Sequence, residues 1–143
     1  MNLEITGHDY STIKVFLGGT CNNDNWRDEF VKGLKMPYFN PVVSDRTEEA
    51  KEREDKEKLE CAYSVYAITD NMKGLYSIAE LIDSVHRNTY GTIFINLTRE
   101  IDEERARSLK DVESLVEERG SKVFHTLEDA RNFLNEEWNI LRM

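Results

Sequence analysis

The chain has 143 residues, of which 39% are hydrophobic and 33% are charged, and its formal net charge at pH 7 is −9. This length suits one domain with a hydrophobic core of its own. An acidic surface repels polyanions, so the charge argues against DNA or RNA as a ligand. We expect a small-molecule ligand and no nucleic acid polymer.

The longest apolar runs are only a handful of residues, too short to cross a membrane. The N-terminal residues are polar and lack the apolar core of a signal peptide. We therefore expect a cytoplasmic protein with no membrane partner. The two cysteines, Cys21 and Cys61, and the three histidines show no spacing typical of metal ligands or of a disulfide framework. We expect no metal and no cofactor.

Apolar runs alternate with helical patterns along the chain, after a loose lead-in at residues 1–12. Such alternation favours a parallel sheet. We expect one α/β domain over residues 1–143, Rossmann-like or flavodoxin-like, with about five parallel strands flanked by helices. The strands are expected at residues 13–17, 38–43, 63–69, 92–97 and 122–125, and the helices at 26–34, 45–60, from 77 onward, 101–119 and after 126.

Residues 45–60 form a charge run in which thirteen of sixteen positions are Asp, Glu, Lys or Arg. We interpret it as a solvated helix stabilised by pairs such as Glu54–Lys58, four residues apart. A binding role is expected only at its start, where Asp45 and Arg46 follow the second strand.

The segment most informative about function joins the third strand, a turn at Gly74 and a helix that opens at Ser77. It delivers Asp70 and Glu80 to the carboxyl edge of the sheet, where ligands bind in open α/β folds. Ser77 and Glu80 also match a capping box, in which the glutamate bonds back to the cap. Against this, Glu80 lies off the apolar stripe of its helix, and two carboxylates at one edge suit glycosidic-bond chemistry. Spacing alone leaves both interpretations open.

Gly18, Gly19 and Thr20 follow the first strand, where glycines let the backbone approach a ligand closely. The pattern is neither a dinucleotide fingerprint nor a phosphate-binding loop. A plain strand-to-helix turn explains it equally well. Trp26 and Tyr76 are candidates to stack on a base, although aromatic residues in such places more often belong to the core or its rim.

In this order and spacing, the motifs resemble those of the nucleoside 2-deoxyribosyltransferases, in particular the branch found in bacteria and phages. The resemblance extends over residues 13–97. The matching segments are Val15-Phe-Leu-Gly-Gly-Thr20, Trp26-Arg27, Tyr38-Phe-Asn-Pro-Val-Val43 with Asp45, and Gly74-Leu-Tyr-Ser-Ile-Ala-Glu-Leu81.

The resemblance implies that Glu80 is a nucleophile. It would attack C1′ of a 2′-deoxyribonucleoside or its 5′-monophosphate, expel the base and hold the sugar as an ester. A second purine or pyrimidine base, or water, would then take the sugar. The resemblance also implies a homo-oligomer, a dimer or larger, and no cofactor. The implied substrate-binding residues are Gly18, Gly19, Thr20, Trp26, Asn40, Asp45, Gly74, Tyr76 and Ser77.

The departing base needs a proton, and here the sequence departs from the family. The aspartate expected two residues before Gly74 is Met72. Asp70, four residues before Gly74, is the candidate second catalytic residue, with Asp45 and Tyr76 as alternatives. Ser77 at the helix N-terminus could hold a 5′-phosphate or serve only as a cap.

Two other functions stay open. A relative with altered base contacts would only hydrolyse deoxynucleotides. A non-catalytic module on the same fold would bind or sense a nucleotide, with Glu80 gripping a ribose hydroxyl or capping its helix. A phosphorylase is less favoured, because no arginine-rich phosphate clamp lies beside the glycine turns.

Overall fold

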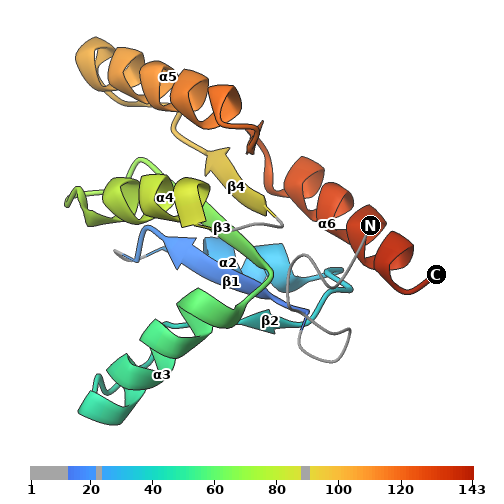
Figure 1. Cartoon of the computed structure of the whole chain (residues 1–143). Coiled ribbons are helices and arrows are strands. Elements are labelled where there is room, and N and C mark those ends of the chain that lie inside the picture. Colours follow the sequence, from blue (N-terminus) through green and yellow to red (C-terminus); the bar gives the residue numbers. More distant parts are fainter. Residues whose placement is uncertain (1–12, 22–23, 88–90) are drawn as a thin grey trace.

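The alternating apolar runs build one parallel sheet, which confirms the α/β fold predicted from the sequence (Figure 1). The computed structural model describes residues 13–21, 24–87 and 91–143. The strand order is β2-β1-β3-β4-β5, and every neighbouring pair is parallel. The strands are β1 (Val15–Gly19), β2 (Tyr38–Phe39), β3 (Tyr63–Ile68), β4 (Gly91–Asn96) and β5 (Lys122–Phe124).

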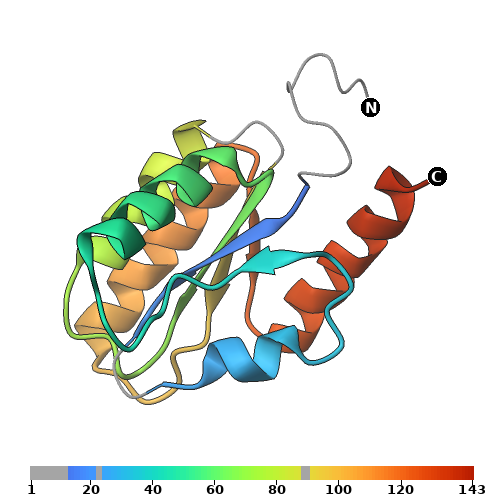
Figure 2. The same cartoon turned by 90° about the horizontal axis from the view of Figure 1, so that it is seen from below.

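Helices cover both faces of the sheet in the described part of the chain. In Figure 2, α3, α4 and α5 lie on one face and α2 and α6 on the other. None of these helices is long and apolar enough to cross a membrane. The helices are α2 (Trp26–Val31), α3 (Glu48–Glu60), α4 (Tyr76–Arg87), α5 (Glu103–Glu118) and α6 (Leu127–Leu141).

Side-chain alternation along the strands divides the core into two clusters, as expected for a sheet buried on both faces. On β1, Val15 and Leu17 point into the cluster under α2 and α6, which includes Phe30 and Leu134. Phe16 points into the opposite cluster, whose members include Tyr66 and Ile68 of β3, Leu81 of α4 and Leu109 of α5. The site described below lies on the Phe16 side.

The strand order places a topological switch point between β1 and β3. From β1 the chain moves outward to β2, then crosses back to β3 on the other side of β1. In doubly wound sheets, ligands bind outside the carboxyl ends of the strands at this point. The carboxyl ends of β1 and β3 carry Gly19-Thr20 and Thr69-Asp70, so the glycine turns at 18–19 and 74 lie at the same edge of the sheet.

Element boundaries differ from the prediction in two informative places. Strand β2 stops at Phe39, because the Asn40 side chain accepts a hydrogen bond from the Val42 amide and Pro41 has no amide to donate to a ladder. Helix α4 begins at Tyr76, where the Leu75 carbonyl accepts hydrogen bonds from the next turn. The predicted lead-in at residues 1–12 lies outside the described residues.

Gly18 and Gly19 are required by the close approach of β1 to β3. A Cβ on Gly18 would lie 2.4 Å from Cε1 of Tyr66. Gly19 has φ +115°, and a Cβ there would lie 2.2 Å from the Ala67 carbonyl oxygen. Packing within the sheet therefore accounts for both glycines without a ligand.

Candidate active site

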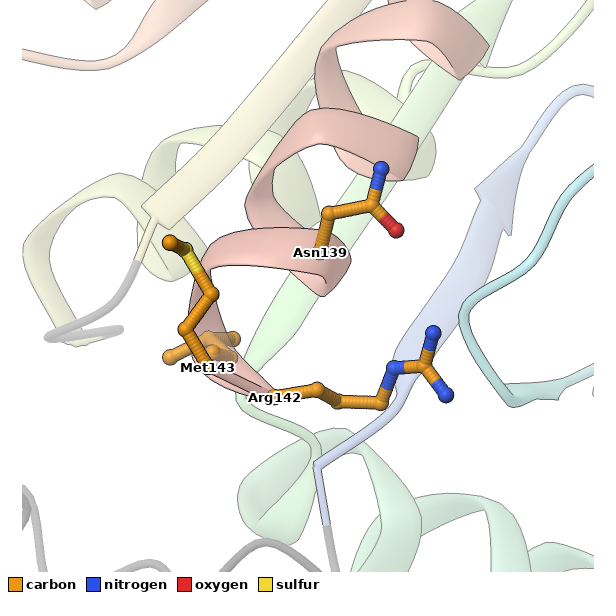
Figure 3. A pocket seen from close by; sticks show the side chains of 4 residues that line it. Asn139, Arg142 and Met143 are labelled. Atoms are coloured by element: carbon orange, nitrogen blue, oxygen red, sulfur yellow. The ribbon is translucent and has the colours of Figure 1, made fainter.

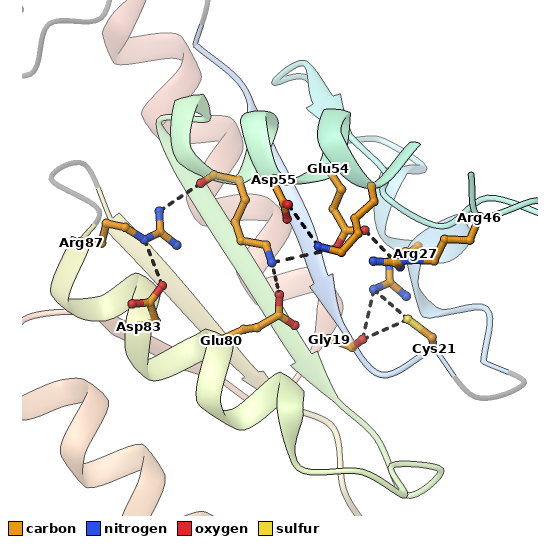
Figure 4. Close-up of polar contacts among 11 residues, drawn as sticks. Gly19, Cys21, Arg27, Arg46, Glu54, Asp55, Glu80, Asp83 and Arg87 are labelled. Carbon is orange, nitrogen blue, oxygen red and sulfur yellow. Dashed lines mark hydrogen bonds and ion pairs between the residues drawn. The ribbon is translucent and has the colours of Figure 1, made fainter. Parts of the chain in front are cut away.

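An ion pair between Glu80 and Lys58 lies at the start of α4. The Lys58 Nζ donates to Oε2 of Glu80 at 2.5 Å, and each side chain is only 14% exposed (Figure 4). This contact overturns the capping-box interpretation: Ser77 is the second residue of α4, and the Glu80 carboxylate bonds α3 rather than the start of its own helix. Oε1 of Glu80 has no hydrogen-bond partner among the described residues.

The surroundings of Lys58 favour its charged form. Burial alone would lower its pKa, but the hydrogen bond and the charge of Glu80, helped by Tyr76 and Glu54, outweigh this and raise the pKa. The stabilisation contributed by the Lys58 charge is therefore complete at neutral pH, and it is lost as the pH rises through the elevated pKa, above the ordinary lysine value of about 10.4. The rings of Phe16 and Tyr76 each lie 5.9 Å from the Lys58 Nζ.

Glu54 connects this pair to a cavity. One of its oxygens lies 4.0 Å from the Lys58 Nζ, and the other lies 3.2 Å from Nη1 of Arg46. Glu54 and Arg46 line a cavity of about 200 Å³ beyond the carboxyl end of β1, together with Cys21, Pro41, Val42 and Val43. Its apolar walls and charged rim suit a flat heteroaromatic ring better than a fully charged ligand.

Arg27 holds the backbone at the β1 end of this cavity through hydrogen bonds. Its guanidinium donates to the carbonyl oxygens of Leu17 (3.0 Å) and Thr20 (2.9 Å). It also donates to the Gly19 carbonyl oxygen (3.2 Å) and contacts Sγ of Cys21 at 3.8 Å (Figure 4). Burial lowers the pKa of Arg27, although Cys21, Asp24 and Glu54 oppose that effect. Arg27 thus fixes the backbone of the glycine turn.

We expect Arg27→Met to lower the free energy of unfolding by about 2–4 kcal/mol, because three buried carbonyls would lose their donor. Urea denaturation measures this. Arg107→Met is the matched control, since Arg107 is exposed on α5. A loss below about 1 kcal/mol for Arg27→Met would show that the turn does not depend on these bonds.

Trp26 and Thr20 are buried rather than open to a ligand. Trp26 is 2% exposed, packs in the core and donates from Nε1 to the Thr20 carbonyl. Thr20 is also buried, and its hydroxyl accepts from the Thr69 amide. Stacking of a base on Trp26 is not possible in this conformation, so we leave both residues out of the proposed ligand contacts.

Asp70 faces away from Glu80. Its two carboxylate oxygens accept from the backbone amides of Arg99 (2.8 Å) and Glu100 (3.1 Å), which ties the end of β3 to the loop after β4. Met72, in place of the expected aspartate, packs against the apolar cluster on the α4 side. The structure therefore brings no second carboxylate from this turn into contact with Glu80.

The other predicted residues lie around the edge. Tyr76 is 73% exposed beside Lys58, and Ser77 is half-buried next to it in the first turn of α4. Asn40 and Asp45 are exposed at the two ends of the loop that lines the cavity. A Cβ on Gly74 would meet nothing within 4 Å, so the folded chain itself does not require glycine there.

The hydroxyl of Tyr66 is a buried polar group with no hydrogen-bond partner among the described residues. Burial, followed by the charge of Glu80, raises its pKa, so it stays protonated. We expect Tyr66→Phe to stabilise the protein by about 1 kcal/mol. Tyr63→Phe should instead destabilise it, because the Tyr63 hydroxyl bonds Glu137. Thermal unfolding of both variants measures this, and a destabilised Tyr66→Phe would contradict the assignment.

Two further cavities lie away from Glu80. One, of about 430 Å³, is an apolar groove between α4 and α5 that includes Ile78 and Val112. The other, of about 660 Å³, lies at the C-terminal end of α6 beside Asn139, Arg142 and Met143 (Figure 3). Helix α6 runs back from the carboxyl end of β5, so this cavity is at the opposite edge of the sheet. No cluster of three or more potential metal ligands occurs among the described residues.

Lys58, Glu54 and Arg27 are the site residues that sequence reasoning missed. The charge pattern predicts Glu54 and Lys58 as a pair on the solvated surface of a helix. One pattern does indicate that they face inward: Ala50, Glu54, Lys58 and Cys61 follow each other at helical spacing. The small residues at both ends of this row mark the side of α3 that faces the protein.

Comparison with protein-family models finds no match for the chain, and comparison with curated proteins finds no significant relative.

Proposed function

We propose that the protein cleaves or exchanges the N-glycosidic bond of a 2′-deoxyribonucleoside or its 5′-monophosphate, with Glu80 as nucleophile. One observation carries this proposal: a part-buried carboxylate at the carboxyl edge has one oxygen held by a lysine and the other without a partner among the described residues. The resemblance to nucleoside 2-deoxyribosyltransferases at Gly74–Leu81 supports the same assignment.

The chemistry proceeds through a sugar with oxocarbenium character, whose positive charge a nearby carboxylate stabilises and then captures. The absence of a 2′-hydroxyl makes C1′ easier to ionise. In this proposal the base lies in the cavity beside Val42 and Val43, with Arg46 and Glu54 at its polar edges. At about 200 Å³ the cavity is below the usual range for whole ligands, about 300–1,000 Å³, so it suits the base alone.

The leaving base needs a proton donor. Asp70 is engaged with two backbone amides in this conformation. Tyr76, exposed beside Lys58, and Asp45, beside the cavity loop, are therefore the donors we favour. Water in place of a second base as acceptor would make the enzyme a hydrolase. The homo-oligomer, the cytoplasmic location and a role in nucleotide salvage belong to this same proposal.

A second candidate is a nucleotide-binding module without turnover. Two observations favour it: Lys58 neutralises Glu80, and Asp70 is not free to act as an acid. In such a module Glu80 would accept a hydrogen bond from a sugar hydroxyl.

One assay separates the two functions. The protein is incubated with each deoxynucleoside or its 5′-monophosphate, with and without a different free base, and the products are separated by chromatography. A new nucleoside shows transfer, and free base alone shows hydrolysis. Binding by calorimetry with no product at any enzyme concentration would favour the module and exclude the enzyme.

A further inference from the structure

Several charged side chains of helix α3 point toward the rest of the protein rather than into solvent. Glu54, Glu57 and Lys58 are its least exposed long side chains, whereas Leu59 is 66% exposed. A charge taken out of water is costly unless it is paired. On α3 each is paired, and two of these ion pairs fasten the helix to other elements: Glu57 binds Lys14, and Lys58 binds Glu80.

The two pairs differ in what they hold. Lys14 precedes β1, and its Nζ lies 2.7 Å from Oε2 of Glu57, which also accepts from the Cys61 thiol. That pair joins α3 to the residue before β1, at a distance from the cavity. Lys58 instead holds the carboxylate of Glu80 at the edge where β1 and β3 end.

Lys58 is itself held in place. Nη1 of Arg87, near the end of α4, donates to the Lys58 carbonyl at 3.1 Å, and Arg87 is paired in turn with Asp83 (Figure 4). The Phe16 and Tyr76 rings flank its ammonium group. Helix α4 thus contacts the backbone of Lys58 through one residue and its side chain through another, which limits the positions open to the ammonium group.

We propose that Lys58 is the positioning residue of Glu80: its ammonium holds Oε2 and leaves Oε1 to attack C1′. This inference rests on the proposed function. In the first step Oε1 bonds C1′ while the bond from C1′ to the base nitrogen breaks; the base leaves with that electron pair and gains a proton from the acid. In the second step a base nitrogen or a water oxygen bonds C1′ and gives up its proton to the acid that was deprotonated in the first step, and Oε1 leaves with its electrons. Lys58 keeps its proton throughout.

Other charged or titratable groups face the pair from the surrounding elements, and their effects are common to wild type and variant. They are Glu54 from α3, Tyr66 from β3, and Tyr76, Asp83 and Arg87 from α4.

The test compares Lys58→Met with Lys14→Met in the full chain, measuring kcat and KM of glycosidic cleavage. Lys14→Met is the matched control, because it removes the ion pair between Lys14 and Glu57 of α3 without touching Glu80. We expect Lys58→Met to lower kcat by about 10–100-fold with a smaller change in KM, since a misplaced nucleophile loses the reactive geometry. Lys58→Arg should recover part of the rate.

The outcomes separate the two claims. No turnover by the wild-type protein would overturn the proposed function, and the positioning role with it. Wild-type turnover with equal kcat and equal KM for Lys58→Met and Lys14→Met would overturn the positioning role alone. A stability cycle checks the contact without activity: denaturation midpoints of Lys58→Met, Glu80→Gln and the double variant should be non-additive, and additive shifts would refute the coupling.

Discussion

Replacing Glu80 with glutamine should lower the rate of glycosidic cleavage or exchange by about 10³-fold or more, because an amide cannot serve as the nucleophile. The glutamine side-chain oxygen can still accept the hydrogen bond from Lys58. The local geometry should therefore survive, and the lost rate reports on chemistry rather than on a collapsed site. Product formation from a deoxynucleoside, followed by chromatography, measures the effect.

Glu118→Gln is the matched control for Glu80→Gln. It makes the same change at an exposed glutamate at the end of α5 that is not among the proposed ligand contacts. We expect it to keep close to the wild-type rate. If Glu80→Gln also stays within about tenfold of wild type, the carboxylate is not the nucleophile.

Gly19→Ala should produce the largest loss of stability, about 3 kcal/mol or more. The new Cβ would lie 2.2 Å from the carbonyl oxygen and 2.6 Å from the amide nitrogen of Ala67, on a backbone with φ +115°. Both strands are central in the sheet, so neither can move without breaking pairing on its other side. Urea denaturation of the purified variant measures the change.

Gly74→Ala provides the contrast. Its new Cβ would lie in open space, so stability should be unchanged or raised by about 0.4–1 kcal/mol. An equal loss of stability in the two variants would contradict the packing explanation for Gly19. A loss of activity in Gly74→Ala without a loss of stability would show that a ligand approaches the backbone there.

Much of the fold followed from the sequence because strand and helix periodicities are local. The runs at β3 and β4 are mostly apolar, as strands buried on both faces are, and the structure places them inside the sheet rather than at its edges. The length of β2 was overestimated because Val42 and Val43 extend the apolar pattern. The side chain of Asn40 ends the strand by bonding the Val42 amide.

The site was less predictable, because side-chain direction depends on packing between distant elements. Asp70 does follow the end of β3 as expected, but its carboxylate accepts hydrogen bonds from amides in the loop after β4, about thirty residues further on. Trp26 shares the helical stripe of Phe30, and that spacing already favoured the core over a ligand contact. Lys58 lies in a run so uniformly charged that only the small residues at its two ends, Ala50 and Cys61, mark its inward side.

The most direct test of the account is whether Glu80 becomes covalently attached to the sugar. The protein is mixed with a deoxynucleoside or its 5′-monophosphate and quenched in acid, and its intact mass and peptide map are measured. The account predicts a gain of one deoxyribosyl group, or of its 5′-phosphate form, on the peptide that contains Glu80, and no gain in Glu80→Gln. Turnover with the adduct on another residue, or at an equal rate in Glu80→Gln, would contradict it.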